Sequence, residues 1–357
     1  MSAPVRRVGV LTFHRCYNYG SYWQARCMVE GLRGMGHDAE LLDHHCDIVR
    51  RAEVRCLYQP ALPERTARTD LPAYKRKGRA FERSFAALPL SQRFGLHTPG
   101  DAGAYDAIVV GSDEVWNFQH PWYGHKSTFF GEGLNADRLV AYAASFGNHD
   151  AARGMDGWWA SRLERFAAIS VRDANSRALV AAALPGEPAL VLDPCLQFAD
   201  AIPRTPADEA APYLLLYGHG FPDWLVAALD RSRARTGVRV ISIGYRNAVA
   251  DEQRLDAGPA EFAALMAGAT GVVTNFFHGC VFALVNGKPF ATAPSPYRFN
   301  KVRDLAAALD ANDRILSPED ADARLEALLS TPPGPQVGQA IADLRARSQI
   351  FLDAALA

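Results

Sequence analysis

The chain has 357 residues, of which 49% are hydrophobic and 22% charged, the balance of an ordinary water-soluble globular protein. Its net charge of −1 gives no electrostatic basis for binding nucleic acid. No apolar run approaches the roughly 18 residues of a membrane span. The six cysteines form no CxxC pair and no metal-ligand spacing, so we expect reduced thiols, no metal and a cytoplasmic protein.

Short apolar runs alternate with helical stretches, and this pattern predicts βαβ units with mostly parallel sheets. In the first half the predicted strands span 7–13, 39–43, 106–111, 139–145, 168–172 and 189–192. The predicted helices there span 20–34, 156–166 and 174–184. The apolar stretch VGVLTF after the N-terminal arginines is too short for a secretion signal, so it is predicted to be the first strand.

Residues 58–94 interrupt the alternation. They carry basic residues interleaved with aromatic ones: Arg65, Arg68, Lys75, Arg76, Lys77, Arg79 and Arg83, with Tyr74, Phe81, Phe85 and Phe94. We interpret the segment as a solvated helical insertion with one apolar stripe, attached to an N-terminal lobe of residues 1–198. The alternative is a basic lip over about 65–83, which would contact a lipid-linked, phosphorylated sugar or an anionic membrane surface.

A Pro- and Ala-rich segment at 199–212 lacks periodicity and is predicted to link this lobe to a C-terminal lobe of residues 213–335. In the second lobe the predicted strands span 213–220, 238–245, 271–277 and 288–294. Helices are predicted at 222–236, 259–267, directly after Gly279, near 301–309 and 318–329, and at 336–355. We expect the segment 336–357 to pack back on the N-terminal lobe. The predicted fold class is α/β, with two doubly wound Rossmann-like lobes and an interdomain cleft.

Polar residues follow the predicted strands, at the edge where ligands bind in open α/β sheets. In the first loop Asn18 and Ser21 suit helix caps, and Gly20 permits close approach of a backbone. In GSDEVWN at 111–117, Asp113 or Glu114 could accept a proton from a hydroxyl group. The alternative is that Asp113 caps a helical turn and Trp116 lies in the core.

Two further strand ends carry charged residues. Arg172 ends a strand in AISVRD, and guanidinium geometry fits bidentate contact with phosphate or carboxylate. The alternative for Arg172 is an ion-pair partner at the surface. Asp193-Pro194 follows the next strand, where a structural turn explains it at least as well.

The segment TNFFHGCVFALVNGKPF at 274–290 places His278 at a strand–helix junction. There it would lie beside backbone N–H groups and the positive end of a helix dipole, which suits an anionic ligand. Its apolar residues are predicted to be core. Cys280 is interpreted as a small packed residue, with a thiol nucleophile as the alternative.

Four segments together, NYGSYWQA at 18–25, GSDEVWN, AISVRD and the 274–290 segment, resemble the polysaccharide pyruvyl transferase family over roughly residues 7–310. The resemblance implies a GT-B-like fold and transfer of a pyruvyl group from phosphoenolpyruvate to a sugar diol, which forms a ketal and releases phosphate. The expected partners are phosphoenolpyruvate and a sugar acceptor, free or lipid-linked, with no cofactor beyond the donor.

With the residue analysis, this resemblance makes His278 and Asp113 the candidate catalytic residues. The candidate donor-binding residues are Arg172, Asn18, Gly20, Ser21, Asn275, Gly279, Lys288, Arg298 and Lys301. The candidate acceptor-binding residues are Ser112, Glu114, Trp116 and Asn117. Two departures from the family pattern are Cys280 in place of a common threonine and Phe276 where some members carry arginine; Lys288, Arg298 or Lys301 would replace that cation.

Two other functions stay open at this point. A nucleotide-sugar glycosyltransferase of the same architecture would need an acidic residue for the ribose, and Glu261 is the candidate, although helix capping explains it more simply. A binding relative without catalysis is disfavoured because the histidine and the arginine are both present.

Overall fold

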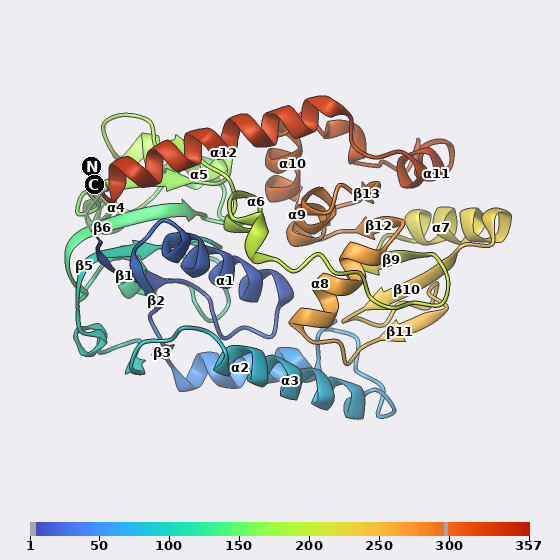
Figure 1. Cartoon of the computed structure of the whole chain (residues 1–357), viewed down its shortest axis with the longest axis horizontal. Coiled ribbons are helices and arrows are strands. Elements are labelled where there is room, and N and C mark those ends of the chain that lie inside the picture. The colour runs from blue at the N-terminus through green and yellow to red at the C-terminus, as the bar shows by residue number, and fades with distance from the viewer. Residues whose placement is uncertain (1–4, 296–298) are drawn as a thin grey trace. The chain divides into compact units, whose positions relative to one another are not determined.

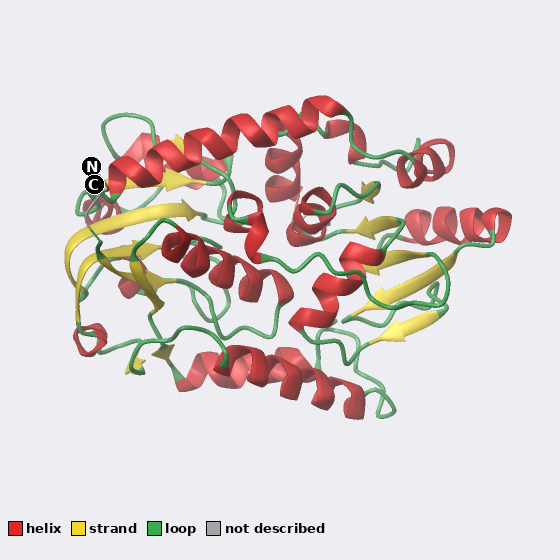
Figure 2. Ribbon diagram, in the orientation of Figure 1, coloured by secondary structure: helices red, strands yellow, loops and turns green. Residues whose placement is uncertain are grey.

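The computed structural model of the protein describes residues 5–295 and 299–357 (Figure 1). The chain forms two compact units. Unit 1 comprises Met1–Glu53, Ala87–Ala201 and Ile341–Ala357, and unit 2 comprises Val54–Ala86 and Ile202–Ala340. Each unit contains a parallel β-sheet flanked by helices (Figure 2). The chain therefore passes back and forth between the two units and does not complete one before it starts the other.

Unit 1 is built on a six-stranded sheet whose neighbouring strands are all parallel, in the order β2-β1-β5-β6-β7-β8. Its strands are β1 (Arg7–Leu11), β2 (Asp38–Leu41), β5 (Ala104–Val110), β6 (Asn135–Ala144), β7 (Ala168–Val171) and β8 (Ala189–Leu190). The apolar run of β5 is buried, as expected where helices cover both faces of a sheet. The strand order reverses between β1 and β5, so the carboxyl ends of these two strands form a topological switch point.

The remaining elements of unit 1 connect these strands. They are α1 (Tyr19–Gly34), α2 (Asp47–Tyr58, in unit 2 from Val54 on), α4 (Gly157–Leu163), α5 (Ala174–Ala183), α6 (Pro194–Gln197), the paired β3 (His44–His45) and β4 (Phe94–Gly95), and the 3₁₀ turns η1 (Pro99–Ala102), η2 (Ser127–Phe130), η3 (Ala151–Arg153) and η4 (Ala199–Ala201). The last helix, α12 (Pro335–Ala355), belongs to unit 1 from Ile341 on. Within unit 1 the Leu192 amide donates to Ser348 Oγ at 2.9 Å, and Arg345 donates to the Leu196 carbonyl at 2.7 Å.

Unit 2 contains a five-stranded parallel sheet in the order β11-β10-β9-β12-β13. Its strands are β9 (Tyr213–Tyr217), β10 (Arg239–Ile243), β11 (Glu252–Arg254), β12 (Gly271–Thr274) and β13 (Phe290–Thr292). Its helices are α3 (Leu71–Ala86), α7 (Asp223–Thr236), α8 (Pro259–Gly268), α9 (Phe277–Val285), α10 (Phe299–Ala308) and α11 (Ala321–Ser330), with the 3₁₀ turn η5 (Asn312–Arg314). The switch point lies between β9 and β12. Both units are thus doubly wound and Rossmann-like, and this part of the predicted fold class is confirmed.

The basic segment does not belong to the N-terminal lobe, where the sequence analysis placed it. Val54–Ala86 is part of unit 2, and α3 packs against α8 there. Two ion pairs tie it to unit 2: Arg246 binds both carboxylate oxygens of Asp70, and Arg76 contacts Asp256 at 2.9 Å. Because these partners lie about 180 positions away in sequence, the neighbouring residues gave no sign of this attachment.

Residues 199–212 begin with η4, and from 203 to the start of β9 they form no helix or strand. The division between the units falls at Ala201 and Ile202, inside this segment. Among the residues that the structure describes, no helix has the length and apolar character needed to cross a bilayer.

Candidate functional site

The switch point of unit 1 gathers polar side chains from four strand ends. Arg172 follows β7, Asp113 follows β5 and Asp193 follows β8, while Ser21 lies in the first turn of α1, after β1. All four residues are buried. Ser21 Oγ donates to Asp113 Oδ2 at 2.8 Å, so these two predicted site residues are directly bonded. Parallel strand ends at one edge explain why residues so distant in sequence meet here.

Arg172 is held between two carboxylates. Its Nη1 donates to Asp193 Oδ2 at 2.8 Å and its Nη2 donates to Asp113 Oδ1 at 3.1 Å. Burial alone would lower the pKa of this guanidinium, but Asp113 and Asp193 raise it above its usual value. The charge of Arg172 is therefore matched inside the protein by two carboxylates, and its role as a phosphoenolpyruvate ligand stays a prediction. The sequence analysis interpreted Asp193 as a turn residue, and the structure shows that it is also a partner of Arg172.

Asp113 has an unusual backbone, with φ of 69°, a region that aspartate tolerates better than most residues. In this conformation the Asp113 side chain accepts a hydrogen bond from its own loop: the Glu114 amide donates to Oδ1 at 2.9 Å. The side chain is only 10% exposed. Asp113 is therefore a fixed carboxylate at the carboxyl end of β5, in the position expected of a base that receives a proton from a hydroxyl group.

The start of α1 does not offer amides to an anion. Asn18 Oδ1 accepts from the amides of Gly20 and Ser21 at 2.9 and 3.3 Å, which is ordinary N-capping. The Ser21 hydroxyl is bonded to Asp113. The amides of Gly20 and Ser21 thus complete the helix cap and the Ser21 hydroxyl bonds Asp113, while the roles of Asn18, Gly20 and Ser21 in donor binding stay predictions.

Three of the four predicted acceptor-binding residues are buried, and one is partly exposed. Trp116 is completely buried and its indole N–H donates to the Phe129 carbonyl, so it is a core residue. Asn117 is also buried and uses its amide to bond Glu114, Asn148 and the Gln119 backbone. Ser112 is buried beside Arg172 and Asp193. Glu114 alone among the four is partly exposed.

A third buried carboxylate, that of Asp173, neighbours this edge. Asp173 caps α5, accepts from the Ser176 amide at 2.7 Å and accepts from Ser145 Oγ at 2.6 Å. Burial raises the pKa of Asp173, although these hydrogen bonds oppose the rise. With Asp113 and Asp193 it makes the strand ends of unit 1 rich in carboxylates, an environment that favours hydroxyl groups over anionic ligands.

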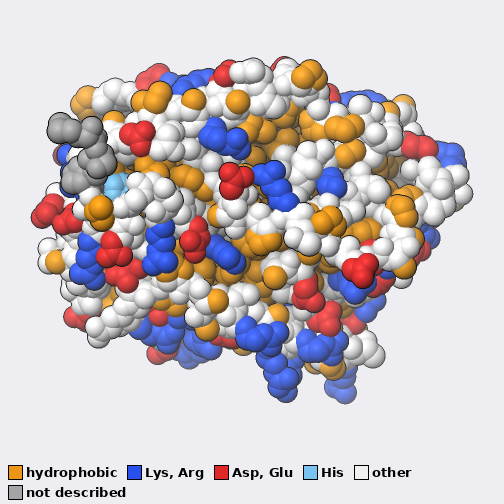
Figure 3. Space-filling model, viewed as in Figure 1, with side chains coloured by type: hydrophobic (Ala, Val, Ile, Leu, Met, Phe, Trp, Pro, Cys, Tyr) orange, Lys and Arg blue, Asp and Glu red, His pale blue; other side chains and the backbone are white. Residues whose placement is uncertain are grey.

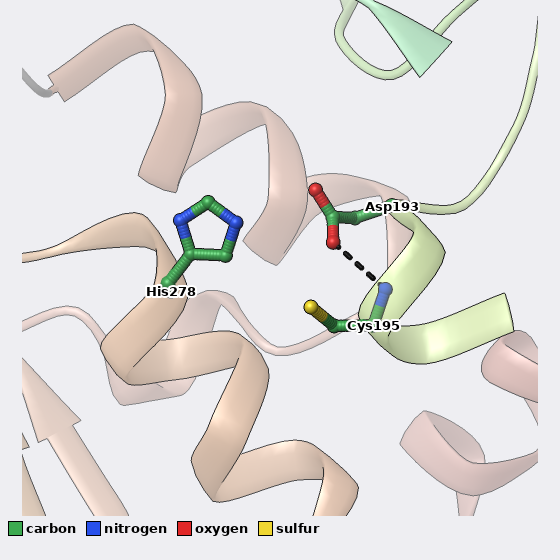
Figure 4. A group of neighbouring side chains, drawn as sticks. All are labelled: Asp193, Cys195 and His278. Carbon is green, nitrogen blue, oxygen red and sulfur yellow. Dashed lines mark hydrogen bonds between the residues drawn. The ribbon is translucent and has the colours of Figure 1, made fainter. Parts of the chain in front are cut away.

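The switch point of unit 2 places His278 in the first turn of α9, just after β12. The helix begins at Phe277, three residues earlier than predicted, and the capping position holds Phe276, which contributes no capping side chain. A Cβ at Gly279 would overlap the Thr274 hydroxyl, so glycine allows the first turn of α9 to lie against the end of β12. The Gly279 amide itself donates to the Phe276 carbonyl at 3.0 Å. The His278 ring is half-buried and projects from this turn (Figure 4).

Asn275 is fully buried, and its role as a donor ligand stays a prediction. Its amide nitrogen donates to the His219 carbonyl at 2.8 Å, which fixes the orientation of the amide group. The remaining oxygen, Oδ1, can only accept hydrogen bonds and lies against Gly218. Asn275 therefore clamps the loop after β9 beside the start of α9, and an oxygen acceptor is unsuited to a phosphate.

The three predicted replacement cations have different outcomes. Lys288 precedes β13 and follows the carboxyl end of α9, so it lies at the opposite edge of the sheet from His278, because β12 and β13 are parallel. Lys301 is buried in the first turn of α10, which follows β13 and lies on the same side as His278. Arg298 lies outside the described residues.

Two alternatives from the sequence analysis, a thiol nucleophile at Cys280 and a ribose ligand at Glu261, lose support. Cys280 is buried, and burial raises the pKa of its thiol to about 12, which disfavours the thiolate that a nucleophile requires. Glu261 accepts from the Gly258 amide at 2.7 Å at the start of α8, which is the glutamate half of a capping box, since glycine has no side chain to supply the other half. This bond agrees with the capping interpretation of Glu261.

Asp193 also caps α6, where its Oδ1 accepts from the Cys195 amide at 3.0 Å (Figure 4). Of the side chains drawn there, Asp193 and Cys195 belong to unit 1 and His278 to unit 2. Neither unit by itself groups three metal-ligating side chains among its described residues.

A family model described as polysaccharide pyruvyl transferase matches residues 18–292. No curated protein is significantly similar in sequence to this chain. Among solved structures, a glycosyltransferase of Streptomyces sp. SF2575 complexed with thymidine diphosphate is 14% identical, with 99% of this chain and 100% of that chain covered and a TM-score of 0.47. The UDP-GlcNAc 2-epimerase of Neisseria meningitidis is 10% identical, with 96% and 99% covered and a TM-score of 0.48. That of Methanocaldococcus jannaschii is 10% identical, with 96% and 99% covered and a TM-score of 0.49.

Proposed function

Because the chain belongs to the polysaccharide pyruvyl transferase family, we propose that it transfers the pyruvyl group of phosphoenolpyruvate to two hydroxyls of one sugar residue. The product is a cyclic pyruvate ketal, and phosphate is released. The acceptor is a polysaccharide unit or its lipid-linked precursor. The observation that carries the donor assignment is His278 in the first turn of α9, at the switch point of unit 2, where the helix dipole favours an anion.

The chemistry needs a proton donor and a proton acceptor. Protonated His278 gives its proton to the methylene carbon of the donor, which leaves C2 as an oxocarbenium centre. One sugar hydroxyl adds to C2 and loses its proton, and the second hydroxyl then displaces phosphate from C2. One hydroxyl proton thus replaces the proton that His278 gave, and the other leaves with phosphate, so the atoms balance.

The carboxylate-rich strand ends of unit 1 suit the acceptor. Asp113, held by Arg172 and Ser21, receives the hydroxyl proton, and the partly exposed Glu114 binds a neighbouring hydroxyl. Arg172 positions Asp113 in this scheme and does not bind the donor. A nucleotide-sugar reaction has less support, because the Glu261 carboxylate accepts a hydrogen bond from the Gly258 amide at the start of α8.

The direct test is calorimetric titration of the protein with phosphoenolpyruvate, with UDP-sugars in parallel, followed by assay of phosphate release with a panel of sugar diols. We expect binding of phosphoenolpyruvate alone and phosphate release only when an acceptor is present. His278→Gln should lower turnover roughly 10²–10⁴-fold, as expected for loss of a general acid, and should weaken donor binding much less. The exposed His97→Gln is the matched control. Failure of the wild type to bind phosphoenolpyruvate would overturn the proposal.

A further inference from the structure

Helix α3 brings a lysine to the ligand-binding edge of unit 2. Lys77 Nζ donates to the carbonyl of Gly244 at 3.3 Å, and Gly244 is the first residue after β10. Lys77 is only 3% exposed, whereas its helix neighbours Lys75 and Arg76 are exposed. The buried face of α3 thus carries one cation, and that cation lies at the carboxyl end of a strand adjacent to β9.

Aromatic rings connect this lysine with the start of α9. Lys77 Nζ lies 5.2 Å from the ring centroid of Tyr245, within the range of a cation–π interaction. The Tyr245 ring lies 5.0 Å from His219, which follows β9, and His219 lies 5.6 Å from Phe276 at the start of α9. Tyr245 and His219 are both half-buried. Lys77, His219 and His278 therefore stand at the ends of three adjacent strands, β10, β9 and β12.

We propose that Lys77 is the fixed cation of the donor site in unit 2. It lies behind Tyr245 and His219, and the polar ring atoms of these two residues contact the carboxylate or phosphate of the donor. This inference rests on the proposed function and assigns the cation that Lys288 cannot supply. A charge in a buried position acts through a lower effective dielectric than a surface charge, so one lysine has a large effect on an anion at this edge.

Three acidic residues of unit 2, in α8 and in the segments that precede α3 and α8, bond to other groups. Asp70 pairs with Arg246, Asp256 pairs with Arg76, and Glu261 caps α8 through the Gly258 amide. Burial lowers the pKa of Lys77 to about 7. An anion bound beside it favours the protonated amine, so donor binding at pH 8 should be accompanied by uptake of a proton.

The test is calorimetry with phosphoenolpyruvate at pH 8 in two buffers of different ionisation enthalpy, which measures protons taken up on binding. We expect uptake approaching one proton for the wild type and for Lys75→Met, the exposed control on the same helix. Lys77→Met should bind at least tenfold more weakly and take up fewer protons than the wild type. His219→Gln should bind more weakly but retain uptake, and Lys77→Arg should recover part of the affinity.

Two outcomes are decisive and distinguishable. If the wild type does not bind phosphoenolpyruvate, the proposed function fails and this inference fails with it. If the wild type binds but Lys77→Met, shown to be folded by its thermal unfolding, binds equally well or takes up the same number of protons, only the role of Lys77 is overturned. If Lys77 only stabilises the fold, we expect Lys77→Met to bind phosphoenolpyruvate as the wild type does.

Discussion

Two carboxylates hold the Arg172 guanidinium, and this pairing determines the effect of its replacement. Arg172→Met would remove the cation that pairs with the buried carboxylates of Asp113 and Asp193, so we expect a loss of about 3–5 kcal/mol in the free energy of unfolding. Turnover should fall because Asp113 loses its orientation, while donor affinity should stay close to the wild-type value. Arg172→Lys keeps the charge without the two-pronged geometry and should recover only part of both losses.

Chemical denaturation and donor calorimetry on the same variants check this prediction. A folded Arg172→Lys protein whose donor affinity collapses would instead return Arg172 to the donor site.

Gly279 offers a test of packing at the start of α9. A Cβ there would overlap the Thr274 hydroxyl at the end of β12, so Gly279→Ala should destabilise the protein by roughly 1–3 kcal/mol through overpacking. Gly338, within α12, is the matched control because no atom lies within 4 Å of the Cβ that alanine would add. Gly338→Ala should be neutral or stabilise by up to about 1 kcal/mol. Thermal unfolding compares the two, and equal melting temperatures would contradict the assigned contact.

The sequence located Asp113, Arg172 and His278 because each follows an apolar strand, and parallel strands end at the same edge. It could not assign their partners. Whether Arg172 contacts a ligand or Asp193 depends on side-chain directions and distances across three strand ends, which no local pattern encodes. Lys77 was hidden for a similar reason: in the basic run it looks like its neighbours, and only the packing of α3 separates the buried lysine from the exposed ones.

At the scale of elements, most of the long alternating strands and helices could be predicted. The predicted bounds differ from the observed ones by a few residues at the majority of strand ends. The short elements α6 and β11 were missed because three or four residues carry too little periodicity. The 12-residue helix α2 was also not predicted. The membership of α3 was also beyond local patterns, since its apolar stripe predicts a buried face but not the surface that covers it. Its ion pair from Asp70 to Arg246 spans 176 positions.

The burial of Lys77 predicts a distinctive pH dependence of stability. The folded pKa of about 7 lies below the ordinary value of about 10.4 for a lysine in an unfolded chain. Between these values the unfolded chain binds one more proton than the folded chain, so the contribution of Lys77 to the free energy of unfolding rises with pH, by at most about 1.4 kcal/mol per unit. Below pH 7 the cost of burying the charge is present in full.

Urea denaturation of the wild type and Lys77→Met at pH 6, 8 and 9.5 checks this dependence. The variant should be the more stable protein at pH 6, and the difference should shrink as pH rises, while Lys75→Met follows the wild type. Parallel curves for the wild type and Lys77→Met would show that the amine titrates normally.

At the scale of the whole molecule, the two units present different chemistry at their switch points. Carboxylates dominate the strand ends of unit 1, whereas Lys77, His219 and His278 stand at those of unit 2. This difference follows from the sequence order, since the acidic strand ends GSD and VLDP lie in the first half, and His219 and His278 follow strands of the second. It supports a hydroxyl-bearing acceptor for unit 1 and an anionic donor for unit 2.

Charge is also unevenly distributed along the surface. The chain carries a net charge of −1, yet residues 54–86 contain eight Lys or Arg and three Asp or Glu. Lys75, Arg79 and Arg83 recur every four residues on the exposed face of α3, and Lys and Arg side chains gather over this helix along the lower edge of Figure 3. Leu62, in the turn before α3, is 45% exposed. Basic residues with a nearby apolar one are the features of a surface that contacts anionic lipid.

We therefore expect the protein to bind vesicles of phosphatidylglycerol more strongly than vesicles of phosphatidylcholine, which would bring it to a lipid-linked acceptor. Each basic residue near an anionic bilayer contributes about 1 kcal/mol, so Arg79→Gln with Arg83→Gln should weaken binding about tenfold or more. The control pair, Arg153→Gln with Arg347→Gln, removes the same charge from exposed positions in unit 1 and should leave binding unchanged. Vesicle cosedimentation at low salt measures the difference, which should fall as added salt screens the surface charges. Equal losses in both double variants would mean that net charge alone, and not the face of α3, attracts the protein to the lipid.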